Sequence, residues 1–125
     1  MIAMPQGNVP DAEAALDPAP LASIRQYQRP GGPDLVARIV SVFLEESAGR
    51  VETLLEGLRG GDAEAAARAA HALKSACGNV GAMRLAALCR DIEAHARANR
   101  NAEAATRAAE LELEYARARA ALQSL

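Results

Sequence analysis

Hydrophobic side chains recur along most of this chain at the spacing of amphipathic helices. The clearest run lies between a proline- and glycine-rich break at residues 29–34 and a glycine pair at residues 60–61. Its apolar stripe, spaced by three, four or eight residues, consists of Leu35, Ile39, Phe43, Val51, Leu54 and Leu58. Because an α-helix repeats about every 3.6 residues, this stripe predicts one long helix over residues 35–60.

The same reasoning predicts four more helices. Asp17 followed by Pro18 is a typical helix start, and Asp62 and Asn101 are suitable N-cap residues for two others. A turn at residues 78–81 and a polar break after Ala98 separate the later elements. The predicted helices cover about residues 17–28, 62–78, 82–98 and 101–124. The last of these carries on one face Ala104, Ala108, Leu111, Tyr115, Ala118 and Leu122.

Four long helices joined by short connections predict an all-α fold, an antiparallel up-and-down four-helix bundle. The short extra helix near the N-terminus would cover one end of it. Residues 1–16 contain prolines and a glycine but no apolar period, so we expect a flexible leader or linker there. The folded domain would then comprise residues 17–125.

The composition narrows the class of protein. Half of the 125 residues are hydrophobic but only 2% are aromatic, so the core must be aliphatic, with Cys77 and Cys89 as small apolar members. A net charge of −2 gives no electrostatic basis for binding nucleic acid. No apolar run approaches the ~20 residues of a membrane span, and no signal peptide is recognisable. We therefore expect a cytoplasmic domain without membrane contact.

One helix face carries side chains suited to a chemical role. Projected at about 100° per residue, Leu73, Ala66 and Ala69 lie opposite His71, which therefore points to solvent. Six residues fall within roughly 60° of His71 on this projection. They are Glu64, Ala67, Arg68, Lys74, Ser75 and Gly78.

This stripe fits the capture of a phosphoryl group. A neutral imidazole is a nucleophile near neutral pH, Lys74 can offset phosphoryl charge, and Ser75 can donate a hydrogen bond. Gly78 would let a partner surface come close. Taken singly, each residue has a simpler interpretation: a solvated histidine or lysine, a serine bonded to its own helix backbone, or a glycine at a helix end. The combination on one face favours function.

The motif resembles that of histidine-containing phosphotransfer (HPt) domains in multistep two-component phosphorelays. The matching segments are Ala70-His71-Ala72-Leu73-Lys74-Ser75, Gly78-Asn79-Val80-Gly81, and Leu85, Cys89, Ile92 and Glu93. The resemblance implies a helical bundle in which His71 accepts phosphate, at its outer ring nitrogen, from the phosphoaspartate of a receiver domain. The receiver would belong to a hybrid histidine kinase, and a response regulator would take the group onward.

The resemblance also assigns roles to neighbouring residues. Lys74 and Ser75 would assist the phosphoryl group, although many members have glycine at the position of Ser75. Gly78 would clear space for the receiver, and we expect Glu64, Ala67 and Arg68, which lie on the same stripe as His71, to contact it as well. The chain would need no cofactor and no ATP site of its own, because it is a phosphotransfer intermediate rather than an independent enzyme. It would act as a monomer.

Three alternatives remain open from the sequence. A dimerisation and phosphoacceptor domain of a histidine kinase also places a histidine on a bundle helix, but an acidic residue usually follows it, whereas Ala72 follows here. A helical interaction module would not require His71, Lys74 and Gly78. A metal or haem bundle is disfavoured because His71 and His95 are the two histidines, and Asp91 with His95 fits a solvated surface pair.

Overall fold

The computed structural model describes residues 15–125. The predicted leader, residues 1–16, lies outside this part except for Ala15 and Leu16. The described residues form helices and turns, with no strand among them. The helices are α2 (Ala19–Arg25), α3 (Leu35–Gly60), α4 (Ala63–Val80), α5 (Met83–Arg97), α6 (Asn101–Ala105) and α7 (Ala108–Gln123).

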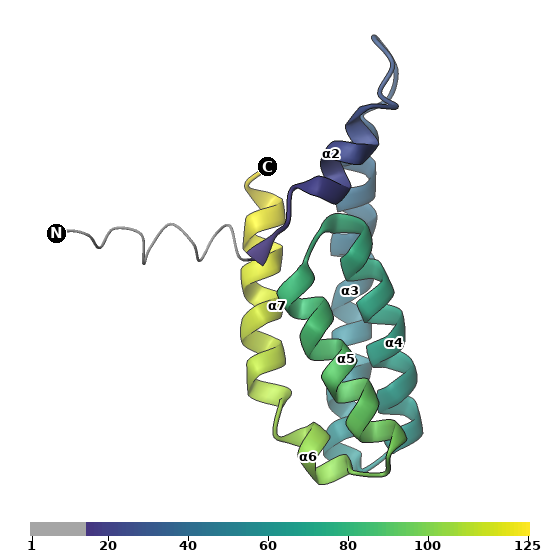
Figure 1. Cartoon of the computed structure of the whole chain (residues 1–125), viewed down its shortest axis with the longest axis vertical. Coiled ribbons are helices and arrows are strands. Elements are labelled where there is room, and N and C mark those ends of the chain that lie inside the picture. Colours follow the sequence, from purple (N-terminus) through teal and green to yellow (C-terminus); the bar gives the residue numbers. More distant parts are fainter. Residues whose placement is uncertain (1–14) are drawn as a thin grey trace, which may run out of the picture.

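Four of these helices build the bundle. Figure 1 shows α3, α4, α5 and α7 running lengthwise with alternating direction, short α6 at the lower end and α2 beside the start of α3 at the upper end. Helix α4 packs closely along both α3 and α5. Helix α7 packs on the same two helices but less extensively. The predicted all-α antiparallel bundle with a short additional helix near the N-terminus is confirmed.

Local capping explains why α3 and the start of α4 lie where the sequence predicts them. The Asp34 carboxylate accepts from the backbone N–H of Ala37 at 3.0 Å, and Asp62 accepts from Ala65 at 3.1 Å. Between the two helices, Gly61 has a φ of 72°, a left-handed conformation that glycine adopts without strain. These residues hold α3 and α4 as an antiparallel pair.

Helix α4 ends later than predicted. It continues to Val80, and Gly81, with a φ of 83°, is the residue that ends it. The predicted turn at residues 78–81 is therefore wrong in its position, and Gly78 lies inside the helix. At Gly81 the carbonyl accepts from the Asp17 N–H at 2.7 Å, and a Cβ would collide with the Asp17 carbonyl. The left-handed backbone and this contact both require a glycine at position 81.

The predicted single helix over residues 101–124 is also wrong, because it is divided into α6 and α7. The Thr106 hydroxyl donates to the Glu103 carbonyl at 2.6 Å, which closes α6 after one turn. Asn101 is the first residue of α6 and not its cap. The predicted short helix likewise ends at Arg25 and not near Gln28, whose side-chain amide donates to the Pro33 carbonyl at 2.6 Å.

The core is aliphatic, as the composition predicts. Small residues on α4 let neighbouring helices approach closely: a Cβ on Gly57 of α3 would lie 3.0 Å from the Ala66 backbone nitrogen. Cys77 and Cys89 are fully buried free thiols, and burial raises the pKa of both, that of Cys89 to about 12. Both cysteines are therefore neutral packing residues at physiological pH.

Polar contacts hold α7 against the bundle. The buried Ser47 of α3 lies 2.8 Å from the Tyr115 hydroxyl, and the buried Glu114 pairs with Arg84 of α5 and with Arg117. At the other end of the chain, Ala15 is buried and Leu16 packs against the core. Ala15 and Leu16, which the sequence assigns to the leader, thus contact the folded helices, and the boundary at residue 17 stays a prediction. None of the described helices is long and apolar enough to cross a membrane.

Candidate functional site

His71 lies in the middle of α4 on its outer side. The helix turns Ala66, Ala70, Leu73 and Cys77 into the core, so the opposite side faces solvent. The His71 side chain keeps 58% of its surface exposed. The prediction that His71 points away from the core is confirmed, and its ring is open to a partner molecule.

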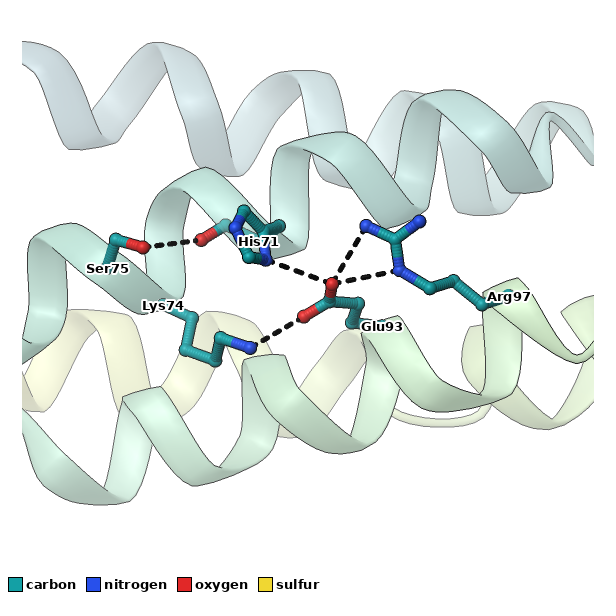
Figure 2. Close-up of polar contacts among 5 residues, drawn as sticks. All are labelled: His71, Lys74, Ser75, Glu93 and Arg97. Carbon is teal, nitrogen blue, oxygen red and sulfur yellow. Dashed lines mark hydrogen bonds and ion pairs between the residues drawn. The ribbon is translucent and has the colours of Figure 1, made fainter.

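The exposed ring is held by a carboxylate from the adjacent helix. Nδ1 of His71 lies 3.0 Å from Oε2 of Glu93 on α5, and the Lys74 ammonium donates to Oε1 of the same carboxylate at 2.8 Å (Figure 2). The Glu93 side chain is only 11% exposed. His71 and Lys74, one turn apart on α4, are thus joined through a single buried anion on α5.

Arg97 is the third donor to this carboxylate. It lies one turn after Glu93 on α5. Its Nε donates to Oε2 at 2.9 Å, and one terminal nitrogen lies at ion-pair distance, 2.9 Å, from the same oxygen. Burial alone would raise the pKa of Glu93, but the hydrogen bonds from Lys74, Arg97 and His71 outweigh it and lower that pKa to about 2. Glu93 is therefore an anion near neutral pH.

This anion determines which ring nitrogen of His71 carries the proton. A carboxylate can only accept hydrogen bonds, so in the neutral ring Nδ1 is the nitrogen that bears hydrogen and donates to Glu93. The lone pair then lies on Nε2, on the far side of the ring. The arrangement produces an exposed nitrogen nucleophile whose ring is fixed at its other nitrogen.

Sequence reasoning missed the contacts of Glu93 and Arg97. In the sequence Glu93 stands only among the residues that resemble the HPt motif, and Arg97 is not predicted to belong to the site. A signal was present, since Glu93 follows directly on the apolar stripe of α5, next to Ile92 and one turn after Cys89. A carboxylate on the buried side of a helix requires donors.

Comparisons with known proteins identify the family of this chain. A family model described as Hpt domain matches residues 38–121. The chain belongs to the Hpt family. Among solved structures, the crystal structure of histidine-containing phosphotransfer protein B (HptB) from Pseudomonas aeruginosa PAO1 is similar. It is 29% identical, covers 88% of this chain and 92% of its own, and gives a TM-score of 0.79. The search of curated proteins returned no match.

Membership of the Hpt family supports a phosphotransfer carrier role in two-component signalling. It also separates this chain from the histidine kinase dimerisation domains that the sequence had left open. The described part of the Hpt domain has no group of three or more residues suited to hold a metal ion. Asp91 forms an ion pair with Arg107 at 2.8 Å, so its carboxylate has a partner other than His95.

Ser75 does not reach toward the exposed ring nitrogen in this Hpt domain. Its hydroxyl donates to the backbone carbonyl of His71 at 3.2 Å (Figure 2). This is the simpler of the two roles considered from the sequence, a bond to its own helix backbone. The Lys74 ammonium, in contrast, donates to the same carboxylate that contacts the His71 ring.

The solvent-facing arc of α4 is narrower than the projection indicated. Glu64 and Arg68 are exposed and pair at 3.6 Å, but Ala67 is only 3% exposed, so its predicted place on the open surface is wrong. The projection treats α4 as an isolated helix, whereas α5 lies along this side of it, and Ala67 shares a hollow with Ala96 and Arg97. Ala67 can present little to a partner.

Gly78 has the free space that a docking role requires. A Cβ added there would meet nothing within 4 Å. Close to it, a groove of about 530 Å³ runs between α3 and α4. Its lining includes apolar side chains of α3 and small residues of α4, namely Ile39, Val42, Phe43, Ala72, Ser75 and Ala76. Val42 is an exposed member of this α3–α4 groove, at 44%.

Proposed function

We propose that this Hpt domain carries a phosphoryl group on Nε2 of His71, receiving it from a receiver-domain phosphoaspartate and passing it to a response regulator. The observation that supports this most directly is the contact between His71 Nδ1 and the Glu93 carboxylate at 3.0 Å. It leaves Nε2 with its lone pair on the 58% exposed side chain. A cytoplasmic location and a monomeric state remain predictions.

The transfer step follows from the protonation state of the ring. The Nε2 lone pair attacks phosphorus, the Nε2–P bond forms, and the P–O bond to aspartate breaks as the aspartate carboxylate leaves with the electron pair. No proton has to move, because Nδ1 keeps its hydrogen. The ring gains positive charge beside the Glu93 anion, which stabilises it. The reverse sequence returns the group to the next aspartate.

Lys74 is positioned to serve the phosphoryl group. Its ammonium has three donor hydrogens, and one of them is used on Glu93 at 2.8 Å. The side chain is 31% exposed, so the ammonium is accessible from the side on which a phosphoryl group would arrive. A cation here offsets the charge on the phosphoryl oxygens.

We propose further that the receiver docks over the α3–α4 groove and Gly78. Transfer requires an aspartate of the partner to reach Nε2, so the partner must cover the surface next to His71. On that side the chain offers an apolar groove with the exposed Val42, and a glycine with open space above it. The exposed Arg68 and Glu64 lie further along the same helix and would contribute to the rim.

The decisive experiment is label transfer from a phosphorylated receiver domain. Wild-type chain should acquire acid-labile, base-stable label, as expected of phosphohistidine, and His71→Gln should acquire none. His95→Gln is the matched control and should transfer normally, because His95 lies outside the site. Label on His71→Gln, or label that survives acid, would contradict the proposal, whereas binding of the receiver without transfer would favour a pure interaction module.

A further inference from the structure

Glu93 is held by two cations, although one would be enough to neutralise it. Lys74 of α4 donates to Oε1 at 2.8 Å, and Arg97 of α5 donates from Nε to Oε2 at 2.9 Å, with a terminal nitrogen also 2.9 Å from that oxygen (Figure 2). The two cations approach different oxygens. Arg97 and Glu93 lie one turn apart on the same helix, so their contact does not depend on α4.

We propose that Arg97 is a positioning residue for phosphotransfer, which holds Glu93 in place so that Lys74 can leave it for the phosphoryl group. This inference rests on the proposed function of His71. It assigns to Arg97 an action through Glu93 rather than a contact with the reacting atoms.

The argument starts from the cost of leaving Glu93 without donors. The carboxylate is 11% exposed, and a buried anion that loses its partner destabilises its surroundings. If Lys74 were its only cationic partner, movement of the ammonium to an arriving phosphoryl group would leave the carboxylate with the imidazole alone. With both Arg97 nitrogens on Oε2, the carboxylate stays paired when Oε1 is released.

Arg97 also keeps the carboxylate in its orientation during this exchange. Oε2 is the oxygen that His71 Nδ1 and Arg97 share, at 3.0 Å and 2.9 Å. Nε donates to Oε2 and a terminal nitrogen lies 2.9 Å from the same oxygen, so the planar guanidinium restricts the carboxylate more than a single ammonium contact would. Nδ1 therefore keeps its acceptor, and Nε2 keeps its lone pair, whether or not Lys74 remains on Oε1.

The charges of the three side chains lead to the same conclusion. Before the partner arrives, Glu93 carries one negative charge and Lys74 and Arg97 one positive charge each. Lys74 can then turn to the phosphoryl oxygens while Arg97 continues to neutralise Glu93. Without Arg97, attraction by Glu93 would retain Lys74 on Oε1, and the phosphoryl group would face a carboxylate and an ammonium already paired with each other.

A double-mutant cycle on the full chain tests this directly. Single-turnover transfer from a phosphorylated receiver is measured at varied receiver concentration for wild type, Arg97→Gln, Lys74→Ala and the double variant. We expect Arg97→Gln to slow the maximal rate about 10- to 100-fold with little change in the half-saturating concentration. Lys74→Ala should slow wild type but change the Arg97→Gln background less than about twofold, because Lys74 is not released there.

Two further variants separate this role from a structural one. Arg97→Lys keeps a cation for Oε2 with fewer fixed donors and should give an intermediate rate. Arg59→Gln is the control, because Arg59 is an exposed arginine at the end of α3 that takes part in none of the ion pairs among residues 15–125. This variant should transfer like wild type. Nitrogen NMR of the His71 ring should show the Nδ1–H form in both wild type and Arg97→Gln, because Glu93 remains an acceptor in each and the slower transfer comes from the retained Lys74.

The outcomes are distinct. Equal maximal rates in wild type and Arg97→Gln, or fully additive slowing by Arg97→Gln and Lys74→Ala, would overturn the inference. Loss of the Nδ1–H form in Arg97→Gln would overturn it too, because the slowing would then come from the ring tautomer and not from the retention of Lys74 on Glu93. If wild type itself takes no label on His71, it is the proposed function that fails, before Arg97 is tested.

Discussion

At the scale of single residues, Glu93 shows how a side chain acquires its role from its neighbours. It is not a nucleophile, yet its carboxylate accepts hydrogen bonds from His71, Lys74 and Arg97 at once. Its buried position makes these contacts necessary, and they in turn determine the protonated nitrogen of the histidine. The nitrogen that we propose accepts phosphate is therefore specified by a residue 22 positions away in the chain.

The pH dependence of stability should report this carboxylate. Hydrogen bonds lower the pKa of Glu93 from 4.5 to about 2, so its contribution to the free energy of unfolding is present above about pH 5. It is lost as the pH falls from about 5 toward 2, by an amount up to about 3 kcal/mol. Chemical denaturation at several pH values measures this loss.

Glu93→Gln provides the control, because it keeps the shape of the side chain and removes the titration. The variant should lack the acid-dependent part of the stability change between about pH 5 and pH 2. It should also transfer phosphate more slowly, since an amide can donate to Nδ1 and so allow the proton to reside on Nε2. An identical pH dependence in both proteins would show that Glu93 is not held as the structure indicates.

At the scale of helices, the two glycines near the end of α4 differ in what they do. Gly81 ends the helix with a φ of 83°, and it lies against the Asp17 carbonyl. Gly78 is helical, with open space where a side chain would be. The same residue type thus meets a backbone requirement at one position and leaves the surface clear at the other.

Substitutions at Gly78 should separate transfer from stability. Gly78→Ala and Gly78→Gln place better helix formers in a helix interior. Each variant should therefore gain up to about 1 kcal/mol in free energy of unfolding and melt at or above the wild-type temperature. Alanine should slow transfer modestly and glutamine severely, because the longer side chain occupies the space above the helix. Calorimetry and label transfer are measured on the same samples.

Gly81→Ala is the comparison that shows the difference between the two glycines. A left-handed backbone with a Cβ costs roughly 1–2 kcal/mol, and the collision with Asp17 adds to it. This variant should therefore lose stability, while any retained folded protein transfers phosphate. Equal rates for wild type, Gly78→Ala and Gly78→Gln would remove Gly78 from the docking surface.

At the scale of the whole molecule, packing decides which helix faces remain for a partner. Helix α4 is flanked by α3 and α5, and α7 lies on the other side of the bundle (Figure 1). The open surface around His71 is therefore a strip bordered on one side by the α3–α4 groove and on the other by the cluster of Glu93, Lys74 and Arg97.

A charge placed in the groove should weaken receiver docking. Val42→Glu, at a position 44% exposed, should raise the half-saturating receiver concentration severalfold without a comparable change in the maximal rate. Leu113→Glu is the matched control, because Leu113 is 52% exposed on α7, away from α4. If both variants behave alike in transfer, the receiver does not use this groove.

The sequence by itself determined the helical class, the bundle, the extent of α3 and the exposure of His71, because these follow from apolar periodicity and local capping. Tertiary structure decided the rest. Only the packing of α5 on α4 brings Glu93 and Arg97 to His71, and it also buries Ala67, which a projection of one helix leaves exposed. The Asp17 contact adds to the requirement for glycine at position 81, where α4 ends, and α7 separates from α6 at Thr106. Contacts between distant segments have no periodicity along the chain, so the pattern that predicts each helix is silent about which neighbours its side chains meet.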